Sequence, residues 1–182
     1  TPRAIRHFHE LSQRFGHKNE VAYNNKGKQL INSYDLSKIS HENFVLVEKA
    51  LWDSNSSLKF FEPPDPTHVS YSLINFQNSY SSKTPYIEVT TITILDLLKL
   101  YSINQEEVAL LKLDIEGAEI EVLNHCMHCG FQPKQILVEY DELNVASDIG
   151  KKRVSDTHQL LIKYGYRILY TDRQADFLYY KS

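Results

Sequence analysis

The most informative segment of the sequence is Leu111-Lys112-Leu113-Asp114-Ile115-Glu116-Gly117-Ala118-Glu119, a predicted buried strand that ends in an acid and leads into a helix. Ligands of open α/β sheets bind outside the carboxyl ends of the strands, so we expect Asp114 to point at a cleft. Glu116 and Glu119 are three positions apart, which predicts neighbouring places on the first turn of the helix. The alternative is that these acids only complement the positive end of the helix dipole.

Strands and helices alternate on both sides of this segment. The predicted strands are residues 44–51, 58–61, 86–91, 109–115, 135–140, 166–170 and 177–180, and predicted helices precede, separate or follow them at residues 2–15, 94–101, 116–129 and 155–164. This alternation favours a mostly parallel sheet with helices on both faces. The last two strands are joined by a short turn, so the terminal strand must be antiparallel. We therefore predict an α/β fold in a single domain that covers residues 1–182.

The composition excludes several classes of function. A formal net charge of -3 and dispersed aromatic residues argue against a nucleic-acid surface. No apolar run approaches the roughly 20 residues that span a bilayer, and no signal-peptide core is present at the start. The two cysteines, Cys126 and Cys129, cannot form a disulfide framework across the chain. We therefore expect a cytoplasmic protein without a nucleic-acid or membrane partner.

Several segments carry a family resemblance in the same order along the chain. The core Asp-Ile-Glu-Gly-Ala-Glu at 114–119, followed by Val122-Leu123, resembles the hallmark of the FkbM-family methyltransferases. Weaker matches to the same family lie at 49–60, 89–96 and 136–140. Together they span about residues 44–180, most of the chain.

The resemblance implies a Rossmann-like class I methyltransferase fold that uses S-adenosyl-L-methionine (SAM). Such an enzyme transfers a methyl group to a hydroxyl, commonly on a sugar, a glycan or a secondary metabolite. By position, Thr1, Pro2, Ala50 and Leu51 are expected beside the adenine. 

The same resemblance assigns the acidic residues. Asp114 is expected near the methionine end of SAM, and Glu116 and Glu139 are expected to line the acceptor pocket. Positioning supplies much of the rate of an in-line methyl transfer, and a carboxylate can also take the hydroxyl proton as general base. Asp114 and Glu116 are both candidates for that base, and the sequence does not decide between them.

The family's domain opens with a strand and a glycine-rich SAM loop, followed by a second strand whose terminal acid holds the ribose. The six glycines of this chain are scattered, and none forms that loop. We therefore expect an N-terminally incomplete domain that lacks its first strands. The exposed sheet edges of such a domain predict self-association into a homo-oligomer.

Other interpretations stay open. A non-catalytic relative would keep the fold as a binding or assembly module. Another Rossmann-like enzyme, such as a nucleotide-sugar enzyme, would use the acid-ended strands for a different cofactor. The segment 125–129, His-Cys-Met-His-Cys, offers soft metal ligands, but no second cysteine pair completes a zinc site, so no metal is predicted. The segment 68–72, His-Val-Ser-Tyr-Ser, either shapes the acceptor pocket or is a polar surface loop.

Overall fold

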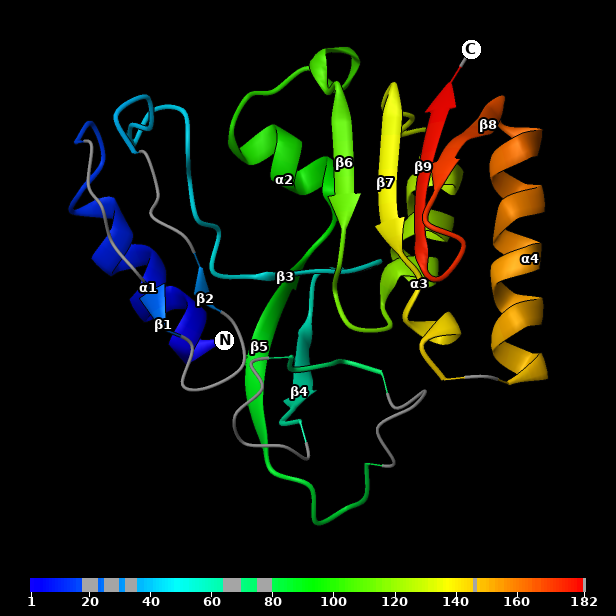
Figure 1. The fold of residues 1–182 in the computed structure, drawn as a ribbon, viewed down its shortest axis with the longest axis horizontal. Coiled ribbons are helices and arrows are strands. Elements are labelled where there is room, and N and C mark those ends of the chain that lie inside the picture. The colour runs from blue at the N-terminus through cyan, green and yellow to red at the C-terminus, as the bar shows by residue number, and fades with distance from the viewer. Residues whose placement is uncertain are drawn as a thin grey trace. The chain divides into compact units, whose positions relative to one another are not determined.

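The computed structural model describes residues 1–17, 36–63, 70–74, 80–145 and 147–181, with the backbone of two short strands at 23–24 and 30–31. The chain divides into two compact units (Figure 1). One unit contains Thr1–Glu48, and the other contains Lys49–Pro64 and Ser70–Ser182. Each unit is described by itself.

The first unit is built around helix α1 (Pro2–Ser12). The predicted start of this helix is confirmed, because the Thr1 hydroxyl accepts a hydrogen bond from the backbone N–H of Ala4 and proline occupies the first turn. The rings of Phe8, Phe15 and Phe44 gather on one side of the helix, with centroids 5.6 to 6.0 Å apart. The short strands β1 (Tyr23–Asn24) and β2 (Leu30–Ile31) pair antiparallel in the same unit.

The second unit contains a three-stranded sheet in the order β3-β5-β4. Its strands are β3 (Ala50–Leu51), β4 (Ser57–Phe61) and β5 (Tyr86–Ile92). Strand β3 pairs with β5 in parallel, whereas β4 pairs with β5 antiparallel. The predicted strand at 44–51 is therefore wrong over most of its length. Only its last two residues form a strand, and Phe44 packs against the rings of the first unit instead.

The same unit contains a four-stranded sheet in the order β6-β7-β9-β8. Its strands are β6 (Leu110–Leu113), β7 (Gln135–Glu139), β8 (Tyr166–Thr171) and β9 (Asp176–Lys181). Strands β6 and β7 are parallel, and the C-terminal strand β9 inserts antiparallel between β7 and β8. That antiparallel terminal strand was predicted. The prediction of a mostly parallel sheet is wrong. Both larger sheets are mixed, because β4 and β9 run antiparallel to the strands beside them.

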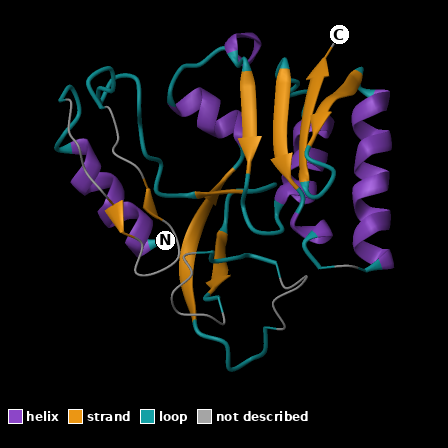
Figure 2. Ribbon diagram, viewed as in Figure 1, coloured by secondary structure: helices purple, strands orange, loops and turns teal. Residues whose placement is uncertain are grey.

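Five helical segments complete this mixed α/β unit (Figure 2). They are α2 (Ile94–Leu100), η1 (Gln105–Glu107), α3 (Glu119–His128), η2 (Asp141–Leu143) and α4 (Asp148–Lys163). Helix α4 begins seven residues before the expected 155, where the Ser147 hydroxyl accepts from the N–H of Gly150. None of the helices in the described parts of the chain is long and apolar enough to cross a membrane.

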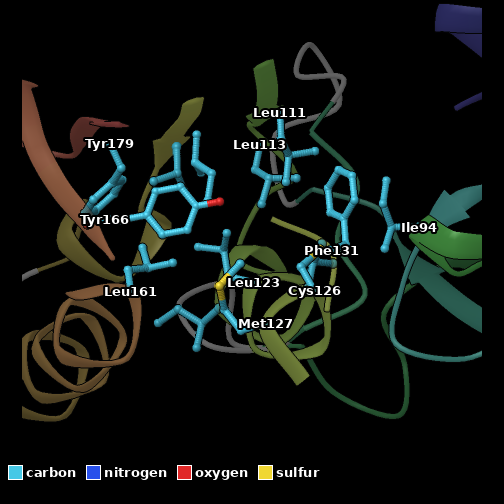
Figure 3. Close-up of a cluster of buried hydrophobic side chains, with 14 of the residues drawn as sticks. Ile94, Leu111, Leu113, Leu123, Cys126, Met127, Phe131, Leu161, Tyr166 and Tyr179 are labelled. Atoms are coloured by element: carbon cyan, nitrogen blue, oxygen red, sulfur yellow. The ribbon is translucent and has the colours of Figure 1, made fainter. Parts of the chain in front are cut away.

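The hydrophobic core lies where α3 and α4 pack against the four-stranded sheet (Figure 3). Alternate residues of the strands point into this core. Leu111 and Leu113 of β6 are therefore buried, whereas Leu110 of the same strand is half-exposed. From the helices come Leu123, Met127 and Leu161. This core anchors β6, α3 and β7, and it thereby fixes the loops that leave the carboxyl ends of the two strands.

Candidate functional site

Acidic residues gather where β6 and β7 end. The two strands are parallel neighbours with Leu113 opposite Val138, so Asp114 and Glu139 leave the sheet at the same edge. Ligands of open α/β sheets bind at this edge. The structure therefore brings together two of the predicted site residues by strand register alone.

The loop between β6 and α3 has an unusual backbone. Glu116 has a φ of 58° and Gly117 a φ of 97°, so both occupy the left-handed region. The expectation that Glu116 lies on the first helical turn is wrong, because α3 begins only at Glu119. A non-glycine residue in this region is strained, and such strain persists only where the surroundings hold it.

Glu119 holds this loop. Its Oε1 accepts a hydrogen bond from the Ile115 N–H at 2.7 Å, and its Oε2 accepts one from the Gly117 N–H at 3.0 Å. The side chain is buried, and burial raises its pKa to about 8. Glu119 thus satisfies the two amides that flank Glu116, a role beyond the dipole complement that the sequence suggested.

Glu116 is the half-buried centre of the acidic edge. Burial raises the pKa of its carboxyl, and the charges of Asp141, Asp114 and Glu139 raise it further, while a hydrogen bond from Ser70 opposes the shift. The three predicted catalytic residues therefore lie within electrostatic reach of one another. We call Asp114, Glu116, Glu139 and Asp141 the acidic cluster.

The remaining members of the acidic cluster have polar partners. Asp114 is largely exposed, and its Oδ2 pairs with Lys112 Nζ at 2.9 Å. The Asn144 side-chain amide donates to Asp141 at 3.2 Å and to Glu139 at 3.4 Å. Asn144 thus ties the acid at the end of β7 to the acid that begins η2.

Asp141 was not among the site residues predicted from the sequence. It is buried, and its Oδ2 would lie 3.3 Å from a β-carbon added to Gly117. A signal was present, since Glu139-Tyr140-Asp141-Glu142 carries three acids directly after a strand. The buried pair of Asp141 and Glu142 on the short helix η2 was not distinguishable from a solvated turn by pattern alone.

The predicted adenine-side residues lie in different parts of the chain. Ala50 and Leu51 form β3, opposite Thr91 and Ile92 of β5, and Leu51 packs at the margin of the hydrophobic core. Thr1 and Pro2 cap and open α1 of the first unit. Their contact with a cofactor stays a prediction. His68 and Val69 of the segment 68–72 lie outside the described residues.

Comparison with known proteins decides the family. A family model described as "Methyltransferase FkbM domain" matches residues 11–168. The chain belongs to the FkbM methyltransferase family. The match includes the loop after β6, the acidic cluster and all of α4. No similar curated protein and no similar solved structure was found.

The segment 125–129 contains both cysteines of the chain. Cys126 is buried in the core, and Cys129 Sγ donates to the Cys126 carbonyl at 3.4 Å. Among the residues that the structure describes, no three His, Cys, Asp or Glu side chains are grouped to hold a metal ion. The acidic cluster is thus spread along an edge rather than converging on one point.

Proposed function

We propose that this FkbM-family protein is a SAM-dependent methyltransferase that methylates a hydroxyl of a sugar, a glycan or a secondary metabolite. The observation that carries the proposal is the half-buried Glu116 at the centre of the acidic cluster, held in a strained loop at the carboxyl ends of β6 and β7. The strand order β6-β7-β9-β8 with an antiparallel last strand supports a Rossmann-like class I fold.

The residues present fit the charge of SAM. The methionine end of SAM carries a cationic sulfonium and ammonium beside its carboxylate, and the four carboxylates of the acidic cluster lie along the edge where Asp114 leaves β6. Asp114, the most exposed of the predicted catalytic acids, is the residue we assign to that end. Ala50 and Leu51 would supply the apolar contact for the adenine, since Leu51 is already packed at the edge of the core.

When bound, SAM supplies a methyl group on a positively charged sulfur that leaves as a neutral thioether. Methylation of a hydroxyl would release its proton, which a base of this protein would take up. Glu116 is the better base than Asp114, because burial raises the pKa of its carboxyl while Asp114 is paired with Lys112. We therefore assign the proton to the Glu116 carboxylate.

The acidic cluster also favours a neutral acceptor rich in hydroxyls. Carboxylates accept hydrogen bonds from several hydroxyls at once, as a sugar presents them. A phosphorylated or carboxylated acceptor would be repelled by the negative charges of Glu139 and Asp141, which already raise the pKa of Glu116 at this edge. Both considerations support an uncharged sugar-like acceptor.

Calorimetric titration of S-adenosylhomocysteine, the reaction product of SAM, tests the proposal. It is made on residues 1–182 and on the same domain extended by its native upstream sequence. Binding to either protein supports the proposal, and binding only to the extended one also supports the expected N-terminally incomplete domain. Folded proteins that bind no S-adenosylhomocysteine would overturn it, and retained binding of NAD(P) or a nucleotide-sugar would favour the rival Rossmann-like enzyme.

A further inference from the structure

Ser72 is a fully buried polar residue next to the acidic cluster. It is 0% exposed, and its backbone forms an isolated bridge with Phe61 at the end of β4. The Phe61 N–H donates to the Ser72 carbonyl at 2.9 Å, and the Ser72 N–H donates to the Phe61 carbonyl at 3.2 Å. The main chain of Ser72 is thus bonded to the end of β4, independently of any contact that its side chain makes.

The hydroxyl of Ser72 reaches across to the loop after β6. Its Oγ donates a hydrogen bond to the Glu116 carbonyl oxygen at 2.5 Å. The same Oγ accepts a hydrogen bond from the Ile74 N–H at 3.0 Å. The Ile74 carbonyl oxygen lies 2.9 Å from the same Oγ. It is a second possible acceptor for the single hydroxyl proton, at a longer distance than the Glu116 carbonyl. The shorter contact joins two segments that are 44 residues apart in the sequence.

The contact falls on one of the non-glycine residues whose φ is positive in the described part of the chain. Glu116 has a φ of 58°, and its two flanking amides are already held by the Glu119 carboxylate. Its carbonyl is held by Ser72. Three hydrogen bonds from two side chains therefore keep Glu116 in a conformation that a non-glycine residue leaves readily when free.

We propose that Ser72 is a positioning residue, which holds the Glu116 backbone so that the carboxylate faces the acceptor. This inference rests on the proposed function, since it assigns Glu116 a task in methyl transfer. Ser72 itself acts only through Glu116, because its hydroxyl bonds to the main chain of Glu116 and Ile74 and to the Tyr80 side chain, and not to the Glu116 carboxylate.

The surroundings of Ser72 agree with this role. The nearby Ser70 side chain bonds to the Glu116 carboxylate. The segment that contains Ser70 and Ser72 therefore contacts both the side chain and the backbone carbonyl of Glu116. The ring of Tyr80 stacks on Phe61 with a centroid distance of 4.9 Å. Burial raises the pKa of Tyr80, and the charges of Glu116 and Asp141 raise it further, which places its hydroxyl beside the acidic cluster.

The test compares Ser72→Ala with Ser72→Thr, which keeps the hydroxyl, and with Thr157→Val as matched control. Thr157 is also buried, and its hydroxyl also donates to a backbone carbonyl, that of Arg153, but it lies on α4. The first readout is hydrogen exchange at the amides of Ile115 and Gly117. We expect exchange about tenfold or more faster in Ser72→Ala, because the loop opens more often, and rates near wild type in the other two variants.

The second readout is the titration of the Glu116 carboxyl, followed by carbon NMR. Ser72→Ala should lower its pKa towards the ordinary value, since a released loop exposes the carboxyl to water, and Ser72→Thr should restore the wild-type titration. A role limited to general stability would instead move Ser72→Ala and Thr157→Val alike.

Unchanged amide exchange and an unchanged Glu116 titration in folded Ser72→Ala would overturn the inference. If that variant does not fold, Ser72→Cys serves in its place, because a thiol is a weak donor and should give intermediate exchange rates. These readouts need neither cofactor nor acceptor. Failure of S-adenosylhomocysteine to bind wild-type protein would therefore count against the proposed function and remain distinguishable from failure of the positioning role.

Discussion

Gly117 and Asp141 approach each other so closely that a β-carbon on Gly117 would lie 3.3 Å from Oδ2 of Asp141. Gly117 also has a φ of 97°, which L side chains rarely adopt. Two independent reasons therefore require glycine at this point. The contact joins the loop after β6 to η2, and it brings the Asp141 carboxylate beside Glu116.

Gly117→Ala should destabilise the protein by about 1–3 kcal/mol, through backbone strain and through displacement of Asp141. Gly130→Ala is the matched control, because Gly130 also has a positive φ of 82° but has nothing within 4 Å of an added β-carbon. Chemical denaturation of the two variants separates the cost of backbone strain from the cost of displacing Asp141. Equal destabilisation would show that the Asp141 contact contributes nothing.

The stability of the protein should fall as the pH rises from about 5 to 8, because Glu119 has a pKa of about 8 when folded and a lower one when unfolded. The unfolded chain releases this proton first, so rising pH favours unfolding. The slope from one such group is at most about 1.4 kcal/mol per pH unit. Burial raises the pKa of Glu116 and Glu142 as well, and both act in the same direction.

Glu119→Gln isolates the contribution of Glu119 to the pH dependence of stability, in denaturation curves measured at several pH values. The variant should flatten the pH dependence, since the amide does not titrate. At pH 5 it should still cost about 1–3 kcal/mol, because the amide nitrogen cannot accept the hydrogen bond of one of the two loop N–H groups. A variant with the wild-type slope would show that another group causes the pH dependence.

The sequence was sufficient to predict β4, β5, β7, α2 and the closing pair of strands, because each has a local signal, such as the short turn that joins the last two strands. The family resemblance assigned Asp114 to the methionine end of SAM and Glu116 and Glu139 to the acceptor pocket, and those roles stay predictions. The sequence could not predict that Glu116 lies outside the helix, since the left-handed turn depends on the tertiary contacts of Glu119 and Ser72. The strand expected at 44–51 failed for the same reason: strand propensity without a neighbouring strand does not form a ladder.

Arg153→Met should destabilise the protein by about 3 kcal/mol, because Arg153 donates to the fully buried carboxylate of Glu142 and to Glu121. The loss should grow with pH, since an unpaired Glu142 resists ionisation further. Lys152→Met is the matched control on the same helix. Its pair with Asp156 is exposed and should be worth no more than about 0.5 kcal/mol. Denaturation curves at pH 5 and 8 check both variants, and similar losses would contradict a buried ion pair.

Glu116→Gln and Asp114→Asn should affect different kinetic constants of methyl transfer, once a screen of neutral hydroxylated compounds has identified an acceptor. Glu116→Gln removes the base, so kcat should fall by about 10²- to 10⁴-fold with little change in the KM for SAM. The wild-type rate should rise with pH through the raised pKa of Glu116, because the base works only when deprotonated, and the variant should lose that rise. Asp114→Asn should instead raise the KM for SAM about tenfold, by weakening one charged hydrogen bond. If Asp114→Asn abolishes kcat while Glu116→Gln changes only KM, the two carboxylates exchange roles, and the buried position of Glu116 serves binding rather than proton transfer.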